Sequence, residues 1–418
     1  MIKTIRLRNW KSFGDAQLHV DPLTVLVGLN ASGKSNLIDA LRFLQRSANL
    51  TLTEAVNGNA QVEEIRGRID MAVWSGESRF AIEVVLLEQD HKELSYTLEV
   101  ERVEQGQIPR LFVWSEKLVR HTLKGARKKQ AALVLFWTDP VDSDAEFITA
   151  RIRNRRGTPH QLHRQSSALH ALGAAEVPDE VKEAIDYVRQ HLRSIFFLDP
   201  VPALARKYSP LSDTLRADGA NMAGIIAGLP DQERVRVERA LKEYVGQLPD
   251  NPFDRIYTEL AGKFQQDAML YGEERLPNGQ TIDIDARAMS DGTLRVVAIM
   301  TAILTSAPSS LIVIEEVDNG IYPSKARLLL SFLDTLSQER KIDILVTTHN
   351  VALMDALSQP GDLLSFVSVV YRQDTDGRSN IVNIVDLAEL PRLLSFGPLG
   401  RVAAQGLLDP YALSGHEA

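Results

Sequence analysis

The stretch Gly28-Leu29-Asn30-Ala31-Ser32-Gly33-Lys34-Ser35 decides the fold of this chain. It fits the pattern G-x-x-x-x-G-K-[ST], in which glycines let backbone N–H groups close around phosphates. A β-branched apolar run at residues 24–27 precedes it and predicts a buried strand. Apolar residues at helical spacing over 35–44 predict a helix directly after it. Strand, loop and helix therefore follow one another in the order that a phosphate-binding loop (P-loop) requires.

A P-loop gives each of these positions a role. Backbone N–H groups cradle the phosphates, the Lys34 ammonium lies on the β and γ oxygens, and the Ser35 hydroxyl is placed to ligate magnesium. The alternative is a glycine-rich turn that only caps a helix, but such a turn needs neither the lysine nor the preceding strand. The predicted nucleotide-binding residues here are Gly28, Asn30, Ala31, Ser32, Gly33, Lys34 and Ser35.

Composition narrows the class of protein. The 418 residues include no cysteine, and the formal net charge is -8. Disulfides, thiol nucleophiles, cysteinyl zinc sites and iron–sulfur clusters are excluded, and the composition fits a reducing compartment. Residues 1–8 show no secretory signal, and polar residues interrupt the uncharged run at 296–314. We therefore expect a cytoplasmic protein without a membrane span.

The hydrophobic patterns divide the chain into segments and predict an α/β fold. The first segment holds the P-loop and strands that we expect to pair antiparallel, and the second is predicted to be a mostly helical insertion. The third alternates helices and strands, which implies a parallel sheet wrapped by helices, and the last is a short tail. The predicted segments are 1–110, 111–285, 286–372 and 373–418.

Two buried strands of the third segment end in polar side chains. The strand at 311–314 runs into Glu315 and Glu316, and the strand at 342–347 is followed by Thr348 and His349. Adjacent strand residues point to opposite faces, so we expect Glu315 to face the metal and Glu316 to activate water. Parallel strands collect ligands at their carboxyl ends, and we therefore expect His349 to meet Glu316 near the phosphates.

A second anion-binding element lies far from the P-loop in sequence. Residues 289–293, Met-Ser-Asp-Gly-Thr, open a predicted helix, so a serine hydroxyl and free backbone N–H groups gather at the positive end of a helix dipole. Two phosphate-binding elements in one chain indicate a shared nucleotide.

Together with Asp318-Asn319-Gly320 and the opening Leu7-Arg8-Asn9-Trp10-Lys11-Ser12-Phe13, these motifs resemble the ABC-type ATPase heads of the RecF/SMC-like class. The resemblance extends to bacterial ATPases related to OLD nucleases and to ATPase subunits of phage-defence systems. It implies the P-loop fold of an ABC head, with an antiparallel β lobe beside the helical insertion. It also implies ATP and Mg2+ as ligands.

The resemblance implies roles for further residues. Ser290 and Gly292 would contact the γ-phosphate held by a second subunit, so that two ATP lie in a head-to-tail homodimer. His349 would sense the γ-phosphate, and Asp318 would belong to a loop that communicates between the sites. Lys34, Glu316 and His349 would be catalytic, and Ser35 with Glu315 would hold the metal. The chain departs from the class at Glu315, which replaces an aspartate, and at Val317 and Tyr322, and Gln61 is one candidate for the magnesium-contacting glutamine.

The insertion and the tail suggest how such an ATPase is used. Residues 117–164 carry eleven Lys and Arg against four acids, which suits nucleic acid or an acidic partner, or else a pair of solvated loops. Only 69 residues follow His349, too few for the nuclease domain that OLD enzymes carry. We expect an ATP-hydrolysing switch, the sensor and scaffold of an antiphage system with a separate effector nuclease. A RecF-like DNA clamp is the alternative, and an oligomer larger than a dimer stays open.

Overall fold

The structure is a computed structural model. It describes residues 1–88, 91–105, 108–124, 128–153, 157–247, 253–322, 325–358, 363–373 and 375–408. Among these residues no helix is long and apolar enough to cross a membrane.

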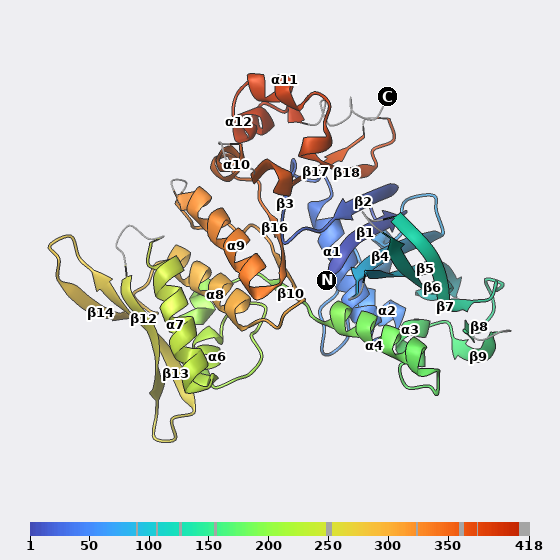
Figure 1. Cartoon of the computed structure of the whole chain (residues 1–418), viewed down its shortest axis with the longest axis horizontal. Helices are drawn as coiled ribbons and strands as arrows, with labels where there is room; N and C mark the ends of the chain where they lie inside the picture. Colours follow the sequence, from blue (N-terminus) through green and yellow to red (C-terminus); the bar gives the residue numbers. More distant parts are fainter. Residues whose placement is uncertain are drawn as a thin grey trace.

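A six-stranded sheet forms the centre of the molecule (Figure 1). Its order is β10-β15-β16-β3-β17-β18, in which β18 is antiparallel to β17 and the other neighbours are parallel. The parallel strands read as short apolar runs because both faces are covered: Ile312 and Ile314 enter one core, and Leu311 and Val313 enter the other. The strands are β3 (Leu23–Val27), β10 (Ile195–Leu198), β15 (Leu311–Ile314), β16 (Asp343–Thr347), β17 (Val367–Arg372) and β18 (Ser379–Asn383).

An eight-stranded antiparallel sheet forms a second lobe, with the order β2-β1-β4-β5-β6-β7-β8-β9. Helix α1 lies between this sheet and the central one, since residues of α1 share a core with both. The strands are β1 (Ile2–Arg8), β2 (Asp15–His19), β4 (Arg79–Leu87), β5 (Lys92–Gln105), β6 (Ile108–Lys124), β7 (Lys128–Thr138), β8 (Phe147–Ile152) and β9 (Thr158–His163).

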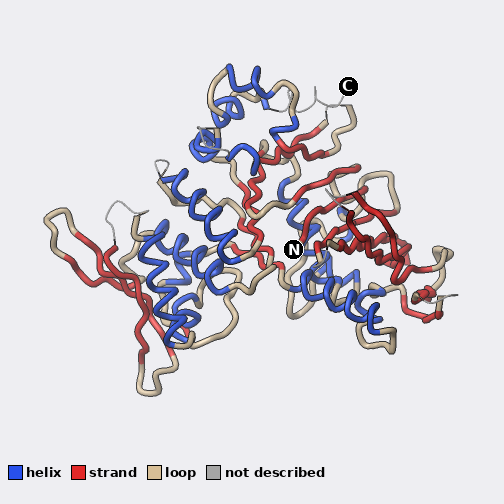
Figure 2. Tube along the Cα trace, viewed as in Figure 1, coloured by secondary structure: helices blue, strands red, loops and turns tan. Residues whose placement is uncertain are grey.

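A third, smaller sheet extends away from the body beside α6 and α7, where Figure 2 shows its strands in red. It consists of β11 (Ser209–Pro210), β12 (Phe253–Ala261), β13 (Asp267–Arg275) and β14 (Thr281–Asp285), with β11, β12 and β14 all paired to β13.

The helices cover the sheets. On one side of the central sheet lie α1 (Lys34–Ser47), α2 (Leu52–Asn57), α3 (Ala168–Leu172) and α4 (Asp179–Arg193), which share the core of the antiparallel lobe. The other core includes α5 (Pro202–Ala205), α6 (Met222–Gly228), α7 (Asp231–Val245), α8 (Asp291–Thr305), α9 (Ala326–Arg340), α10 (Val351–Leu357), α11 (Leu390–Ser395) and α12 (Leu399–Ala404).

The structure corrects the prediction of a mostly helical insertion. The first part of 111–285 is strand, because β6 to β9 extend the antiparallel sheet that begins at β1. The predicted boundary after residue 110 falls inside β6. Helix α4 of this segment ends at Arg193, and the following Ile-Phe-Phe-Leu run forms β10 at the edge of the central sheet. Apolar runs with β-branched and aromatic residues take strand pairing when a partner edge is available.

Predictions for the other segments agree more closely. The antiparallel pairing of β4 and β5 is confirmed, as are the parallel strands β15, β16 and β17. The segment predicted as a short tail contributes β18, which pairs with β17, so the residues after 372 continue the central sheet.

Candidate nucleotide-binding site

The P-loop, the acids after β15 and the polar residues after β16 meet at one cavity of about 340 Å³. They meet because β15, β16 and β3 are neighbours in the parallel sheet, so their carboxyl ends share an edge. The cavity is lined by Asn30, Ala31, Ser32, Gly33, Lys34, Ser35, Asn36, Glu315, Glu316, Thr347, Thr348, His349 and Arg372. Most of the predicted site residues are therefore brought together.

The P-loop is closed on itself by its lysine. Lys34 Nζ donates to the carbonyl oxygens of Gly28 at 2.6 Å and Leu29 at 2.9 Å. Gly33 precedes α1 with φ of 122°, and a Cβ there would lie 2.6 Å from Ser379 Oγ. Ser379 Oγ in turn donates to the Ser32 carbonyl at 2.5 Å. Glycine is needed at 33 both for its backbone angle and because β18 packs directly on the loop.

Glu316 and His349 lie next to each other in the lining of the cavity. His349 Nδ1 lies 3.6 Å from Glu316 Oε1, and both side chains are about half exposed, 52% and 48%. Glu316 has φ of 50°, an angle that costs a residue with a Cβ about 1 kcal/mol. The Glu316 N–H donates to Thr347 Oγ1 at 3.0 Å, which holds that backbone in place. The acid and the histidine thus lie together, as the strand ends predict.

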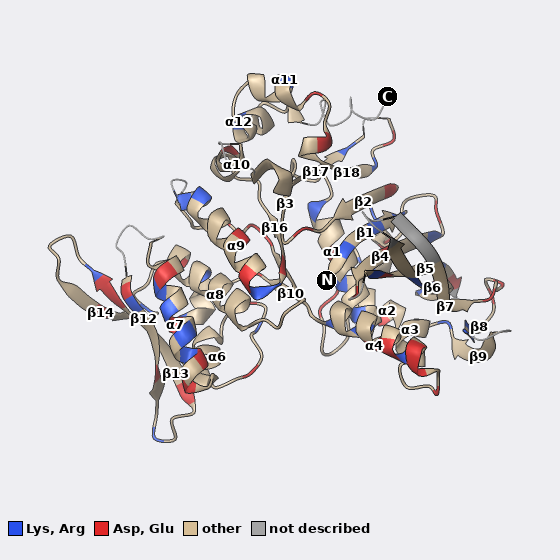
Figure 3. Cartoon of the chain, viewed as in Figure 1, with Lys and Arg blue, Asp and Glu red and all other residues tan. Residues whose placement is uncertain are grey.

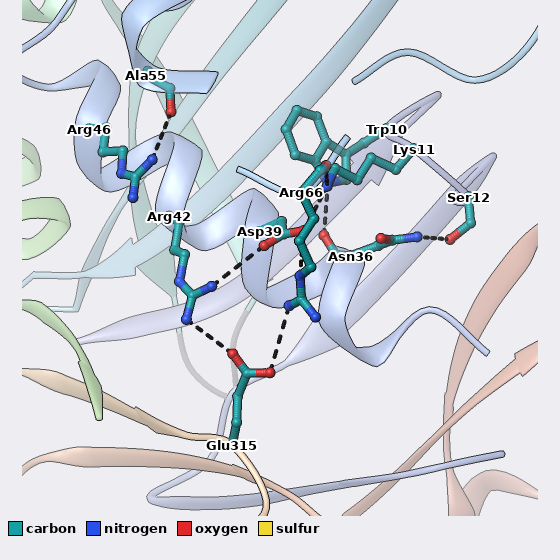
Figure 4. Close-up of polar contacts among 10 residues, drawn as sticks. All are labelled: Trp10, Lys11, Ser12, Asn36, Asp39, Arg42, Arg46, Ala55, Arg66 and Glu315. Carbon is teal, nitrogen blue, oxygen red and sulfur yellow. Dashed lines mark hydrogen bonds and ion pairs between the residues drawn. The ribbon is translucent and has the colours of Figure 1, made fainter. Parts of the chain in front are cut away.

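Glu315 belongs to a network of charges behind the cavity (Figure 4). Its carboxylate contacts Arg42 at 3.0 Å and Arg66 at 3.6 Å. Both arginines also approach the fully buried Asp39, whose carboxylate contacts Lys11 Nζ at 2.6 Å. Burial lowers the pKa of Lys11, although Asp39 opposes that shift. Asp39, Arg42 and Arg66 were not among the site residues predicted from the sequence.

Ser290 and Gly292 do not line this cavity. They line a separate small pocket together with Thr293, Gly320, Ile321 and Tyr322. Ser290 Oγ accepts from the Thr293 N–H at 3.1 Å, which caps α8, and a Cβ at Gly292 would lie 2.1 Å from the Gly320 carbonyl oxygen. Asp318 is buried and lines neither pocket. The helix N-terminus predicted at Ser290 is therefore present, and the pocket that it lines shares no residue with the P-loop cavity.

Three residues at the site were missed from sequence. Asn36 and Arg372 line the cavity, and both also line an adjoining cavity of about 500 Å³ that includes Arg66 and Trp74. Arg372 ends β17, beside β3, so the same strand-end argument could have found it. Arg295 on α8 donates to the carbonyl oxygens of Glu315 at 3.2 Å and Glu316 at 3.3 Å. Gln61 is exposed and lines neither cavity.

The residues present suit a magnesium ion that arrives with phosphates. Ser35 and Glu315 offer a hydroxyl and a carboxylate to the same cavity. Within the described ranges no group of three or more His, Asp or Glu is placed to hold a metal by itself. Mg2+ is typically bound through one or two carboxylates with substrate phosphates and water completing its shell. The donor set fits that mode.

Figure 3 marks the basic and acidic residues of the chain, and the described arginines of the predicted basic segment have acidic partners. Arg120 pairs with Glu88 and Glu180, and Arg153 also pairs with Glu180. Arg151 pairs with Asp139. Arg164 is fully buried and donates to Glu101 and to several backbone carbonyls. Arg127, Arg155 and Arg156 lie outside the described residues. The described arginines of 117–164 are therefore paired with acids of the same chain.

The sequence matches the family described as "AAA domain, putative AbiEii toxin, Type IV TA system" over residues 23–355. This range runs from the P-loop strand past His349. The chain belongs to this AAA domain family. The matched range includes the P-loop at 28–35 and the acids at 315 and 316 of this AAA domain. The search of curated proteins gave no significant match.

One solved structure supports the fold of this AAA domain at low sequence identity. A chain of the SMC head bound to the C-winged helix domain of ScpA is 15% identical, with a TM-score of 0.50 over 91% of this AAA domain chain and 96% of that chain. The SMC head domain from Thermotoga maritima is 16% identical, with a TM-score of 0.44 over 91% and 98%. The first likeness confirms the predicted ABC-head fold with its antiparallel sheet.

Proposed function

We propose that this chain is an ATP-hydrolysing switch that closes as a homodimer, and that it serves as the sensor and scaffold of an antiphage system with a separate effector nuclease. One observation carries the ATPase proposal. The P-loop, Glu315, Glu316 and His349 line one cavity, although about 280 residues or more separate the P-loop from the other three. Triphosphate positioning, metal binding and water activation need these groups at one place.

Each of these residues would have a distinct role in ATP hydrolysis. Phosphates compete with the Gly28 and Leu29 carbonyls for the Lys34 ammonium, which is a point charge on a flexible stem. Glu316, held beside His349, polarises the attacking water. Mg2+ held by Ser35 and Glu315 would offset the charge of the phosphate oxygens. The adjoining cavity with Trp74, Arg66 and Arg372 has room for the nucleoside.

The dimer proposal rests on the position of the second anion-binding element. Ser290 is exposed at the start of α8 and lines a pocket that the P-loop does not share. An exposed serine at a helix N-terminus can receive a phosphate held by another copy. A head-to-tail dimer would therefore complete each site with residues of both subunits.

The defence proposal is supported by the family description, which names a toxin and a Type IV TA system. The solved SMC head with a TM-score of 0.50 is bound to the C-winged helix domain of ScpA. This supports a protein partner for a head of this fold. The alternative, a RecF-like DNA clamp through 117–164, gains no support from Arg120, Arg151, Arg153 and Arg164, because all four are paired or buried.

Nucleotide binding and turnover test the ATPase proposal. Lys34→Ala should abolish binding of a fluorescent ATP analogue and release of phosphate, because it removes the only side-chain charge in the P-loop. Lys182→Ala, at an exposed lysine of α4, is the matched control and should behave like the parent. Equal binding by Lys34→Ala and the parent would contradict the assignment.

Cleavage assays test the effector proposal. The purified chain should cut neither DNA nor RNA with Mg2+ or Mn2+ present, and cleavage should appear only with the product of a neighbouring gene. Lys34→Ala should abolish the activity of that pair. Cleavage by the isolated chain that persists in Lys34→Ala would assign the nuclease to this polypeptide instead.

A further inference from the structure

Both carboxylate oxygens of Glu315 are held by guanidinium groups (Figure 4). Arg42 Nη2 lies 3.0 Å from Oε1, and Arg66 Nη2 lies 3.6 Å from Oε2. Glu315 is 25% exposed and also lines the P-loop cavity. The carboxylate that is proposed to hold the metal is therefore already occupied by two cations.

The two arginines reach Glu315 from outside that cavity, because neither of them lines it. Arg42 projects from α1, is 28% exposed and stacks 5.0 Å from the Phe197 ring. Arg66 comes from the loop after α2, is 54% exposed and lines the adjoining cavity. Arg42 is thus the more firmly packed partner, and Arg66 is the partner that solvent or a ligand reaches.

The charges of this cluster do not favour a free metal ion. Lys11, Arg42 and Arg66 carry three positive charges, whereas Asp39 and Glu315 carry two negative ones. Lys11 and Asp39 are buried, so water screens them weakly. A divalent cation at Glu315 would meet two guanidinium groups that contact the same carboxylate. A single guanidinium about 5 Å away lowers the affinity for a divalent ion by roughly tenfold.

We propose that Arg42 and Arg66 compete with Mg2+ for Glu315, so that the chain takes up the metal together with a nucleotide and not before it. The proposal rests on the ATPase function proposed above. Nucleotide phosphates in the P-loop add negative charge to the cavity, and Arg66 lies in the adjoining cavity where it can turn toward an anionic ligand. Release of one oxygen by Arg66 leaves Glu315 anchored through Arg42, which keeps the carboxylate at the cavity wall.

The contacts with Arg42 and Arg66 depend on the length of the Glu315 side chain. A glutamate carboxylate reaches one methylene further from the backbone than an aspartate carboxylate does. Glu315 bridges from the end of β15 to α1 and to the loop after α2. Glu315→Asp keeps the charge and the type of ligand but shortens that reach, so it should weaken both arginine contacts.

Mn2+ binding without nucleotide, measured by electron paramagnetic resonance of the free ion, tests the proposal. The parent should bind Mn2+ weakly, and Arg66→Gln, Arg42→Gln and Glu315→Asp should each tighten binding by roughly tenfold. Arg66→Lys should restore weak binding because it keeps the positive charge. Arg46→Gln is the matched control, since Arg46 lies one turn further along α1 and donates to the Ala55 and Glu63 carbonyls.

A double variant locates the bound ion. Glu315→Gln in the Arg66→Gln background should remove the gain, which would locate the ion at this carboxylate. The proposal is overturned if the nucleotide-free parent binds Mn2+ as tightly as Arg66→Gln, or if Arg66→Gln and Arg46→Gln are alike. These measurements contain no nucleotide. A parent that fails to bind ATP would contradict the ATPase function, whereas the Mn2+ measurements would still decide whether the two arginines compete for Glu315.

Discussion

Asn319 Nδ2 donates a hydrogen bond of 2.5 Å to Oε2 of Glu316, while Oε1 of the same carboxylate faces His349 Nδ1 at 3.6 Å. The carboxylate proposed to activate water is therefore held from two sides, by the loop after β15 and by the residues after β16. Gly320 of that same loop packs on Gly292 at the start of α8. Four consecutive residues, 317–320, thus lie between that contact and the acid.

Glu316→Gln should bind ATP like the parent but hydrolyse it at least about 100-fold more slowly, because general-base assistance typically contributes 100-fold or more. Phosphate release and equilibrium nucleotide binding measure the two properties separately. Glu176→Gln, at an exposed acid, is the control and should keep full turnover. Parent-like hydrolysis by Glu316→Gln would assign the base to another residue.

Mixed dimers should reveal a shared site. Lys34→Ala and Ser290→Arg should each be inactive alone, whereas an equal mixture should recover about a quarter of the parent turnover, from one intact site in each mixed dimer. Separately tagged subunits would show that mixed dimers form. No recovery in the presence of such dimers would argue against residues acting across the interface.

Gly292→Ala should slow hydrolysis while leaving nucleotide binding at the P-loop intact. The added methyl would lie 2.1 Å from the Gly320 carbonyl oxygen, so the start of α8 or the loop after β15 must move. Overpacking of this kind typically costs about 1–3 kcal/mol of stability. Thermal unfolding and turnover check the two effects, and a variant that matches the parent in both would show that the contact is dispensable.

Asp39→Asn should destabilise the fold strongly. The substitution leaves the buried Lys11 without its charge partner at 2.6 Å and removes the carboxylate that Arg42 and Arg66 also approach. Breaking a buried pair from one side typically costs about 3–5 kcal/mol. Asp15→Asn is the control because its pair with Arg6 is exposed and worth about 0–1 kcal/mol. Urea unfolding measures the stability of both variants. Similar losses in Asp39→Asn and Asp15→Asn would contradict the expectation.

Glu116 should make stability depend on pH. Burial raises its pKa to about 7, although the N–H groups of Ala168 and Leu169 and the Tyr96 hydroxyl donate to it. The folded state therefore binds the proton of the Glu116 carboxyl group more tightly than the unfolded chain does. The free energy of unfolding should therefore fall by roughly 3 kcal/mol between pH 4.5 and 7 and level off above that range.

Glu116→Gln cannot lose a proton, so the difference in unfolding free energy between pH 5 and pH 8 should shrink relative to the parent. Urea titrations at the two pH values measure it, with Glu176→Gln as the exposed control. An unchanged difference would mean that Glu116 titrates near the ordinary range of a glutamate.

Local patterns predicted the nucleotide end of this protein. The P-loop is eight consecutive residues between a strand and a helix, and its conformation follows from that short segment. Glu316 and His349 could be placed together from sequence because both follow buried strands of an α/β unit, and parallel strands end at a common edge. The N-terminus of α8 could be predicted from Ser290 because a capping serine acts within its own turn.

Tertiary structure decided what depends on distant partners. Strands β6 to β9 exist as strands because they extend an edge that starts at β1 and β4, and no local pattern shows whether such an edge is available. Arg372 and Ser379 reach the P-loop only through the pairing of β17 with β3 and β18. Arg42 and Glu315 are 273 residues apart in the chain, and only the packing of α1 on β15 brings their charges to 3.0 Å. Coulomb attraction acts through space, so the sequence alone could name the metal carboxylate but could not show which cations surround it.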